Sequence, residues 1–336
     1  MKITLFGTQP YDRESFDRIR DAYGFDVTYH RSHLNAGNVA LAEGADVVCI
    51  FVNDTADAAT VARLSQLGVR LIALRCAGFN NVDLLSAAQH GIPVVRVPAY
   101  SPHAVAEHAV ALMLSLNRKI HRAYWRTRDG NFSLHGLLGF DLYGKTAGIV
   151  GTGRIARELI RILRGFGMEV IAYDLCPDEA YAAAAGIAYV PLDELYARAD
   201  IVSLHCPLTD RTRYMIGPEA IGRMKPGVML INTGRGQLIH TGALIDGLKQ
   251  KKIGAAGLDV YEEEAKFFFE DHSDTAVQDD TLALLISRPN VILTAHQAFL
   301  TEEALYNIAE VTVQNLDDFF AGKPLKNEVC IRCAGN

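Results

Sequence analysis

The stretch Thr146-Ala-Gly-Ile-Val150-Gly151-Thr-Gly153-Arg-Ile-Ala156 decides the fold of this protein. Its first five residues have the character of a short buried strand, and the run from Ile155 to Phe166 has the apolar spacing of a helix. Between them, Gly151 permits a tight turn, and Gly153 allows the backbone to approach a pyrophosphate. Ala156 is small enough for close packing of the helix on the strand. The pattern predicts a dinucleotide-binding loop.

Two features outside the glycines strengthen this prediction. Arg154 and Ile155 open the helix, where unpaired backbone N–H groups can bind an anion. Asp174 comes directly after the next expected strand, Glu169–Tyr173, about 20 residues after the glycines. A carboxylate at this position accepts hydrogen bonds from an adenosine ribose. The same carboxylate would repel a 2′-phosphate. The motif therefore predicts NAD as the cofactor in preference to NADP.

Short apolar runs alternate with helical patterns along nearly the whole sequence. This alternation is typical of βαβ units and parallel sheets, and the runs are too many for one sheet. We therefore predict an α/β fold with two doubly wound parallel sheets. The expected strands are Lys2–Phe6, Val47–Phe51, Leu71–Leu74, Val94–Val97, Ala147–Val150, Glu169–Tyr173, Ile201–Leu204, Val228–Ile231, Ala255–Leu258 and Val291–Leu293.

The position of the glycine motif sets the domain organisation. It lies in mid-sequence, after a first α/β pattern that ends at Val97-Pro-Ala-Tyr-Ser-Pro102. We expect a long helix from about His103 to Asp129, an acidic loop over 262–280, and a last helix over 301–321. The prediction is a substrate domain formed by 1–100 plus 298–336, with the cofactor domain, 101–297, inserted into it.

The composition excludes several classes of function. The 336 residues are 49% hydrophobic and 21% charged, with a formal net charge of −6, which does not favour a nucleic-acid surface. The sequence contains no run of the ~18 apolar residues that a spanning helix needs, and no signal-peptide core is expected. The six cysteines are scattered, so we expect a reduced cytoplasmic protein without a metal site. Cys330 and Cys333 form one C-x-x-C pair, interpreted as free thiols.

Several side chains at expected strand ends are candidates for acid–base chemistry. His296 and His205 both follow a strand, and their spacing does not distinguish them. Arg235 lies between two glycines after another strand, where it holds a carboxylate, caps the C-terminus of a helix or forms a surface pair. The acidic run Glu262–Glu264 is either a solvated surface or the source of a partner that favours a charged histidine.

The sequence resembles the D-isomer-specific 2-hydroxyacid dehydrogenases, and in particular the bacterial fermentative D-lactate dehydrogenases. The resemblance covers nearly the whole length. Its motifs are Gly151-Thr-Gly153, Leu204-His-Cys-Pro-Leu-Thr209, Asn232-Thr-Gly-Arg235-Gly236, Asp259-Val-Tyr-Glu-Glu-Glu264, Thr294-Ala-His-Gln-Ala-Phe299, Leu74-Arg-Cys-Ala-Gly-Phe-Asn-Asn-Val-Asp83, Val97-Pro-Ala-Tyr-Ser-Pro102, His121-Arg-Ala-Tyr-Trp-Arg-Thr-Arg-Asp129 and Phe267-Phe-Phe-Glu-Asp271.

The resemblance implies a division of roles. It implies that His296 is the acid/base, that Glu264 keeps it protonated, and that Arg235 binds the carboxylate and carbonyl oxygen of the substrate. It further implies that the backbone at Ala77 and Gly78 grips the carboxylate. Tyr100 and Phe299 would wall the side-chain pocket. Residues implied around the cofactor, besides the glycine loop and Asp174, are His205, Cys206, Pro207, Thr209, Thr233, Gly234 and Asp259.

The resulting expectation is a Rossmann NAD domain within a flavodoxin-like substrate domain, reducing pyruvate reversibly to D-lactate with NADH. Two alternatives are a dehydrogenase for a larger D-2-hydroxy acid of the branched-chain type and an NAD-sensing interaction protein similar to the corepressors of this fold. The partner is expected to be a small 2-oxo or 2-hydroxy acid. The resemblance, together with the long helix from His103, implies a homodimer or homotetramer.

Overall fold

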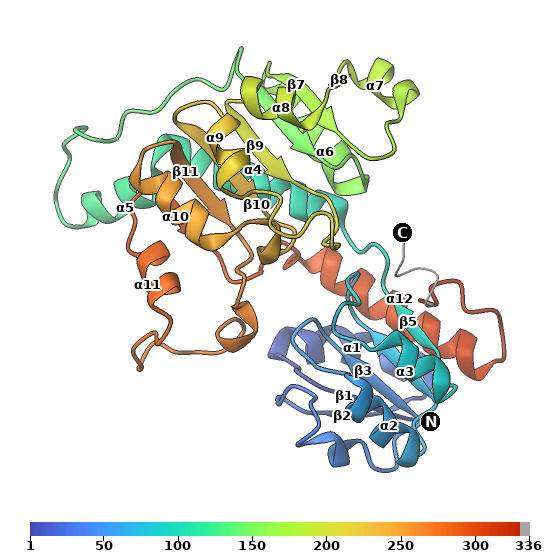
Figure 1. Ribbon diagram of the computed structural model, residues 1–336. Helices are drawn as coiled ribbons and strands as arrows, with labels where there is room; N and C mark the ends of the chain where they lie inside the picture. Colours follow the sequence, from blue (N-terminus) through green and yellow to red (C-terminus); the bar gives the residue numbers. More distant parts are fainter. Residues whose placement is uncertain (330–336) are drawn as a thin grey trace. The chain divides into compact units, whose positions relative to one another are not determined.

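The computed structural model describes residues 1–329, which divide into two units (Figure 1). One unit comprises Met1–Ser101 together with the residues from Leu300 on, and the other is the segment Pro102–Phe299. These cuts lie one and two residues from the expected boundaries. The predicted α/β architecture with two parallel sheets is confirmed. The pair Cys330 and Cys333 lies outside the described residues.

The first unit contains a five-stranded parallel sheet in the order β2-β1-β3-β4-β5. This is the flavodoxin-like order, whose direction reverses between β1 and β3. The strands are β1 (Lys2–Leu5), β2 (Asp26–Tyr29), β3 (Val47–Ile50), β4 (Leu71–Leu74) and β5 (Val94–Arg96). Its helices are α1 (Pro10–Tyr23), α2 (Ala58–Gln66), α3 (Leu84–Gln89), α12 (Glu302–Phe320) and the short 3-10 turn Val39–Ala42.

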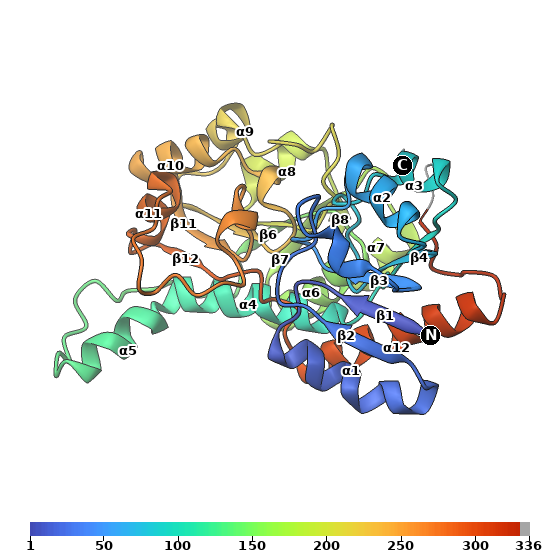
Figure 2. The same ribbon diagram turned by 90° about the horizontal axis from the view of Figure 1, so that it is seen from below.

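The last helix belongs to the first unit, although almost 200 residues of the second unit precede it. Helices α1 and α12 lie side by side on one face of the five-stranded sheet (Figure 2). Phe16 of α1 and Val313 of α12 share a buried cluster with strand residues such as Val47. The apolar face of α12 therefore completes the core of the first unit.

The second unit contains a seven-stranded parallel sheet in the order β12-β11-β10-β9-β6-β7-β8. Numbered from β6, this is the Rossmann order with one additional strand at the edge. The strands are β6 (Thr146–Val150), β7 (Glu169–Tyr173), β8 (Ala188–Tyr189), β9 (Ile201–Leu204), β10 (Val228–Asn232), β11 (Ile253–Leu258) and β12 (Val291–Leu293).

Helices cover both faces of this sheet, which explains why its strands are apolar on both sides. One buried cluster joins the sheet to α4 and α6, and a second joins it to α8–α11. The helices are α4 (Pro102–Arg118), α5 (Ile120–Arg128), α6 (Arg154–Gly165), α7 (Glu179–Ala185), α8 (Leu192–Arg198), α9 (Pro218–Arg223), α10 (Thr241–Lys249) and α11 (Asp280–Ile286), with 3-10 turns at Gly236–Leu238 and Glu264–Lys266.

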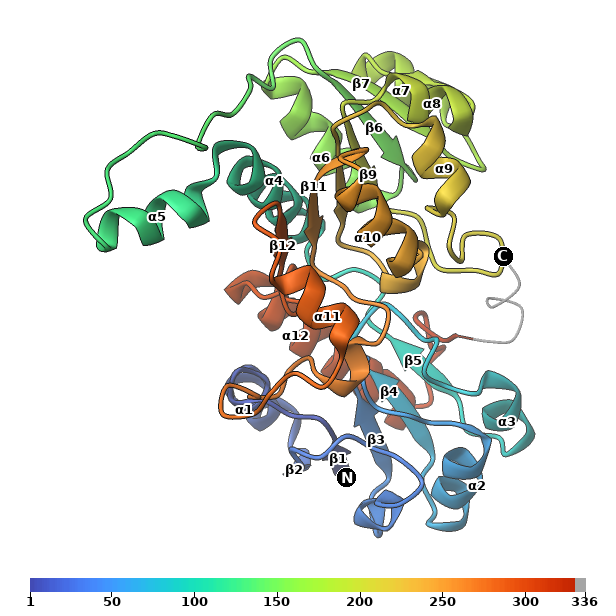
Figure 3. The same ribbon diagram turned by 60° about the vertical axis from the view of Figure 1, so that its left-hand side comes forward.

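The expectation of one long helix from His103 to Asp129 is wrong. The segment forms two helices, α4 and α5, with Lys119 between them in a left-handed conformation (φ 52°) (Figure 3). The returning backbone explains the break. The buried Asn117 side chain donates a hydrogen bond to the carbonyl of Phe140 and accepts one from its N–H. Lys119 Nζ donates to the carbonyl of Leu138 at 2.6 Å. These polar contacts hold the end of α4 against the segment that leads back to β6.

Two strands escaped prediction from the sequence. Strand β2 has an alternation of exposed and half-buried residues, and β8 is only two residues long. Both lie at the edge of their sheets, where one side of the backbone is unpaired and the apolar signal is weakest.

Candidate active site

The candidate residues of the second unit lie at the carboxyl edge of its sheet. Parallel strands end at the same edge, and neighbours there bring together side chains that are distant in sequence. Beyond adjacent strands β6, β9, β10, β11 and β12 lie, in that order, Gly151, His205, Arg235, Glu264 and His296. The direction of winding changes between β6 and β9, so this edge is the place where such sheets bind ligands.

The glycine loop has the geometry that a dinucleotide requires. Gly151 has φ +90°, and a Cβ there would lie 2.8 Å from the backbone of His205 and Cys206, so only glycine fits. A Cβ on Gly153 would meet no atom within 4 Å among the described residues. Gly153 is also the N-cap of α6 without a side-chain cap, which leaves the first N–H groups of the helix, at Arg154 and Ile155, available to an anion.

Asp174 lies directly after β7 as the ribose-binding prediction requires. Its carboxylate accepts hydrogen bonds from the Thr152 backbone at 2.6 Å, the Thr152 hydroxyl at 2.8 Å and the Cys176 backbone at 2.9 Å. Partial burial raises the pKa of Asp174, but the hydrogen bonds from Cys176 and Thr152 outweigh it and hold the pKa below its usual value. The group is therefore a fixed anion, which a 2′-phosphate would avoid.

The two candidate histidines differ in their partners, since of the two only His296 pairs with a carboxylate in the described part of the protein. His205 has Nε2 2.8 Å from the Ser203 hydroxyl, and no carboxylate pairs with it in the described part of the protein. Burial lowers the pKa of His205 to about 4, so the ring is neutral at pH 7. A neutral imidazole without an anionic partner cannot act as a proton donor of imidazolium type. His205 therefore lacks the carboxylate partner that an imidazolium acid needs, and it lies on the loop after β9.

His296 has the partner that His205 lacks. Its Nδ1 lies 2.7 Å from Glu264 Oε1, and both side chains are largely buried, with exposed fractions of 14% and 16%. The other oxygen of Glu264 accepts the backbone N–H of Tyr261 at 3.0 Å, which fixes the carboxylate. The ring of Phe269 lies 6.1 Å from that of His296. The carboxylate orients the ring, so that Nε2 is the nitrogen left for chemistry.

The three consecutive acids, which the sequence did not distinguish, have three different environments. Glu262 accepts hydrogen bonds from the hydroxyls of Tyr214 and Thr241, so it connects loops. Glu263 forms an exposed pair with Lys266 at 2.8 Å. Only Glu264 faces a histidine.

Arg235 lies on a loop that the buried side chain of Asn232 shapes. The Asn232 amide donates to the carbonyl of Arg235 at 2.9 Å and accepts the N–H of Gly234 at 3.0 Å. A Cβ on Gly236 would lie 2.2 Å from the backbone of Tyr261, so this loop packs on the segment that leads to Glu264. The half-buried Arg235 guanidinium donates to the carbonyl of Gly234, and it pairs with no carboxylate among the side chains that the structure describes.

Asp259 holds the turn that carries His296. Its side chain is fully buried and accepts the N–H groups of Gln297 and Ala298, both at 2.9 Å, and the Thr294 hydroxyl at 2.6 Å. Its backbone carbonyl accepts the N–H of His296 at 2.7 Å. His296 has φ 52°, a left-handed conformation that costs about 1–3 kcal/mol in a non-glycine residue and needs such support.

The remaining residues predicted around the cofactor lie on the same edge. Burial raises the pKa of the Cys206 thiol to about 11, so it is no nucleophile at neutral pH. Pro207 and Thr209 are exposed on the loop after β9. The hydroxyl of Thr233 is buried and has no hydrogen-bond partner within residues 1–329, which fits a residue that faces a bound cofactor.

The predicted carboxylate-binding turn belongs to the first unit. Ala77 and Gly78 follow β4 and are half-buried. The carbonyl of Ala77 accepts Arg96 Nη1 at 2.9 Å, and the carbonyl of Gly78 accepts the Cys76 thiol, so both carbonyls are bound within the protein. Tyr100 lies on the same unit, where its backbone carbonyl accepts the Asn307 amide, whereas Phe299 is buried in the second unit.

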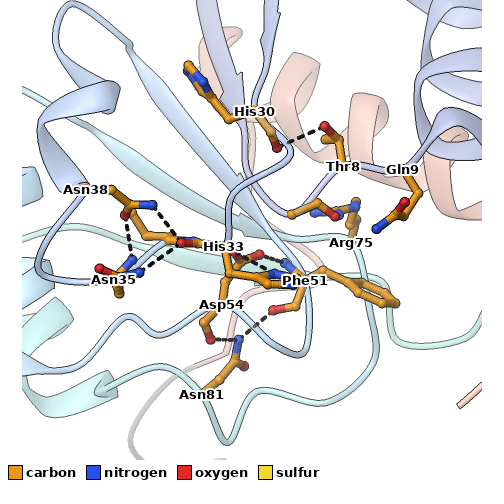
Figure 4. A network of polar contacts seen from close by, with 12 residues as sticks. Thr8, Gln9, His30, His33, Asn35, Asn38, Phe51, Asp54, Arg75 and Asn81 are labelled. Atoms are coloured by element: carbon orange, nitrogen blue, oxygen red, sulfur yellow. Dashed lines mark hydrogen bonds and ion pairs between the residues drawn. The ribbon is translucent and has the colours of Figure 1, made fainter. Parts of the chain in front are cut away.

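Polar side chains that prediction missed support the loops around this turn (Figure 4). The buried carboxylate of Asp54 accepts the N–H of Leu34 at 2.6 Å and that of Phe51 at 2.5 Å. The amide of Asn81 donates to the carbonyls of Phe51 and Asp54. The carboxyl end of β3 is thus tied to the loop after β2 and to the segment that follows the Ala77–Gly78 turn.

Arg75, directly before this turn, is the largest fully buried side chain of the protein's described part. Its Nη2 donates to the carbonyl of Gly7 at 2.7 Å, and its Nε lies 3.4 Å from Asp12 Oδ1. The guanidinium also lies over the ring of Phe51, which Figure 4 shows beside it. Arg75 therefore joins the carboxyl ends of β1, β3 and β4.

Replacing Arg75 with methionine should destabilise the first unit by about 3–5 kcal/mol, because it leaves the buried Asp12 without its cation. Urea unfolding measures the loss. Arg18→Met is the matched control, since Arg18 forms an exposed pair with Glu14 and should change stability by less than about 1 kcal/mol. The double variant Arg75→Met with Asp12→Leu should recover part of the loss. Equal stability of the Arg75 and Arg18 variants would contradict the prediction.

The described residues contain no group of three or more His, Cys, Asp or Glu side chains that could hold a metal ion. No helix in that part of the protein is long and apolar enough to cross a membrane.

Comparisons with known proteins agree with this geometry. Residues 110–298 match the family described as the NAD binding domain of D-isomer specific 2-hydroxyacid dehydrogenases. The chain is 53% identical to a 2-hydroxyacid dehydrogenase homolog of Haemophilus influenzae over 98% of its own length and 99% of that protein. It is 48% identical to the D-lactate dehydrogenase of Escherichia coli over 98% and 100%. The structure of the pyruvate reductase of Chlamydomonas reinhardtii superposes with a TM-score of 0.90 at 48% identity, covering 97% and 98%. The chain therefore belongs to the D-isomer specific 2-hydroxyacid dehydrogenases and is an NAD-dependent oxidoreductase of that family.

Proposed function

We propose that this enzyme reduces pyruvate reversibly to D-lactate with NADH. The observation that carries the proposal is the 2.7 Å pair of His296 and Glu264 beside the Arg235 loop at the carboxyl edge of the NAD domain. Two close relatives support the choice of substrate, since one is a D-lactate dehydrogenase and the other a pyruvate reductase.

The residues present fit the cofactor. The open backbone at Gly153, the free first turn of α6 and the anionic Asp174 would hold the pyrophosphate and the adenosine ribose. The unpartnered hydroxyl of Thr233, with Asp259 and the β9 loop from His205 to Thr209, would line the nicotinamide side. When bound, NADH supplies the hydride.

The proton comes from His296. Glu264 holds Nδ1 and stabilises the imidazolium, so Nε2 donates its proton to the carbonyl oxygen of the 2-oxo acid. Arg235 binds the carboxylate through its planar fork and stabilises the negative charge that develops on the carbonyl oxygen. In lactate oxidation, neutral His296 accepts the hydroxyl proton.

The N–H groups of Ala77 and Gly78 are a further proposed binding group for the substrate carboxylate, on a turn whose carbonyls already accept hydrogen bonds from Arg96 and Cys76. Tyr100 and Phe299 would limit the substrate side chain. Each additional methylene is worth only about 1–3 kcal/mol in such a pocket. A branched-chain 2-oxo acid is therefore the competing substrate within this reaction class.

The test is NADH oxidation at 340 nm with pyruvate and with branched-chain 2-oxo acids, followed by chiral analysis of the product. We expect the highest kcat/KM with pyruvate and D-lactate as the product. A higher kcat/KM with a branched 2-oxo acid would reassign the substrate. NADH binding without turnover of any 2-oxo acid would favour an NAD-sensing interaction protein, a function that needs no pair such as His296 and Glu264.

We further propose that the enzyme is a homodimer. The segment from α5 to β6 extends away from the rest of the second unit (Figure 3) and exposes large apolar side chains. A segment with this many exposed large apolar side chains is typical of a protein interface, and a second copy of the protein is the proposed occupant. The apolar residues are Ile120, Tyr124, Trp125, Phe132, Leu134, Leu138, Phe140 and Tyr143.

The double variant Trp125→Glu with Leu138→Glu should convert the dimer to a monomer, because it places two charges in the apolar surface. Sedimentation velocity measures the mass. Leu85→Glu is the control, since Leu85 is a similarly exposed apolar residue on α3 and should leave the dimer intact. A wild-type protein that sediments as a monomer refutes the dimer, and a tetramer would extend it. We place the enzyme in the cytoplasm, where Cys49, Cys76, Cys176 and Cys206, which form no disulfide, would stay reduced.

A further inference from the structure

We infer that His108, on α4, is a positioning residue for the acid/base His296. The inference rests on the proposed function, in which His296 donates the proton. His108 Nε2 lies 3.1 Å from the hydroxyl of Thr294 and 3.4 Å from Asp259 Oδ1. All four residues belong to the second unit, and His108 is 186 residues away from Thr294 in sequence.

The direction of these hydrogen bonds follows from counting protons. The hydroxyl of Thr294 has one proton and donates it to Asp259 Oδ1 at 2.6 Å. Nε2 of His108 is therefore the donor, and its proton points between the Thr294 hydroxyl and the Asp259 carboxylate. The side chain of His108 is largely buried, with 18% exposed, so water does not readily replace this donor.

Asp259 transmits the effect to the catalytic turn. The fully buried carboxylate accepts hydrogen bonds from the backbone N–H groups of Gln297 and Ala298, which follow His296 in sequence. It also accepts one from the hydroxyl of Thr294, which precedes His296. A buried carboxylate keeps one orientation only while its hydrogen-bond donors are in place. His108 and Thr294 fix Oδ1, and the fixed carboxylate holds the turn on both sides of His296.

The turn needs this support because of its backbone. His296 has φ 52°, and such a conformation persists only where the surroundings impose it. The Nδ1–Oε1 contact of 2.7 Å with Glu264 depends on where this backbone places the ring. Two neighbouring strands bring partners to His108. Asp259, after β11, is the charged group that faces it among the described contacts, and Thr294, after β12, is the neutral one. Loss of the His108 donor should therefore loosen residues 294–298 and separate His296 from Glu264.

The experiment compares three substitutions at His108 with one on the same helix. His108→Leu removes the donor, His108→Asn retains an amide too short to reach Thr294, and His108→Gln can place an amide N–H near the position of Nε2. His103→Leu is the matched control, because His103 lies on the exposed side of α4 beside Glu158.

We expect His108→Leu and His108→Asn to lower kcat for pyruvate reduction about tenfold through misplacement of the acid, with KM for pyruvate nearly unchanged. The pH at which kcat/KM falls to half should move to lower pH, because the imidazolium loses contact with Glu264. Hydrogen exchange should accelerate in the peptide that spans 294–299. His108→Gln should restore most of the activity and protection, and His103→Leu should match the wild type.

Each alternative outcome has a distinct meaning. Wild-type turnover, pH profile and exchange in the Leu and Asn variants would overturn the inference. A uniform rise in exchange across the second unit, with no shift of the pH profile, would make His108 a general core residue and would also overturn it. Hydrogen exchange needs no substrate, so it tests His108 even if the wild-type enzyme turns over no 2-oxo acid and the proposed function fails.

Discussion

Replacing His296 with alanine should lower kcat for pyruvate reduction by about 10²–10⁴-fold, the range that one positioned acid or base contributes. The variant retains the glycine loop, Asp174 and Arg235, so NADH and pyruvate should still bind. The loss should therefore fall on kcat, because the proton from Nε2 is needed only as the carbonyl oxygen becomes negative. Stopped-flow measurement of NADH oxidation gives the loss in kcat, and fluorescence measures NADH binding separately.

The matched control is His90→Ala, since His90 is an exposed histidine at the end of α3 and should leave kcat unchanged. A near-normal kcat in His296→Ala would refute the acid/base assignment. An equal loss in kcat and in NADH affinity would instead indicate that the turn at 294–298, and not the imidazole, had been disturbed. The exchange rates of that turn distinguish these two results.

The choice between His205 and His296 shows where prediction from the sequence ends. Both residues follow a strand of the same sheet, so the pattern places them at the same edge. They differ in what approaches them from elsewhere. Glu264 reaches His296, whereas burial lowers the pKa of His205, whose Nε2 lies beside the Ser203 hydroxyl. Only the resemblance to a family pointed to His296 before the structure did.

Local signals predicted the glycine loop, the positions of most strands and the last helix because each depends on residues close in sequence. The positive φ of Gly151 and the cap at Gly153 depend on the local backbone, although the contact of Gly151 with His205 and Cys206 adds a distant constraint. The same reasoning failed at Lys119, since the break in the helix depends on Phe140 and Leu138 returning to the end of α4. A helical pattern contains no record of a polar partner about 20 residues away.

The support of the site was missed for the same reason. His108, Thr294 and Asp259 come from three separate segments, and none of the three belongs to a short motif that specifies the contact. In the first unit, Asp12 and Arg75 are 63 residues apart, and nothing in either neighbourhood predicts a buried pair. A useful signal remains in hindsight, because Asn232, Arg75 and Asp259 are all polar residues at the end of an apolar strand or directly after it. Such residues cannot stay buried without partners.

Arg235→Lys should lower kcat/KM for pyruvate by about 100-fold or more, although the charge is retained. The guanidinium of Arg235 already donates Nη1 to the carbonyl of Gly234, and the proposal requires its other N–H groups to bind the carboxylate and the carbonyl oxygen of the substrate. A lysine ammonium is one point of charge on a flexible stem and cannot satisfy these directions together. Both a higher KM and a lower kcat are expected, since the contact with the carbonyl oxygen strengthens in the transition state.

Two further variants make this prediction specific. Arg161→Lys, at an exposed pair with Glu158 on α6, should leave the kinetics unchanged. Arg235→Ala should be less active than Arg235→Lys, and guanidinium at low millimolar concentration should restore part of its activity if a planar fork is what the site lacks. An unchanged KM for pyruvate in Arg235→Lys would show that the substrate carboxylate is held elsewhere, and the Ala77–Gly78 turn would then be its main binding group. The hydrogen bonds of Asn232 fix the backbone at Arg235. A loss of activity in Arg235→Lys would therefore reflect the missing planar guanidinium and not a displaced backbone.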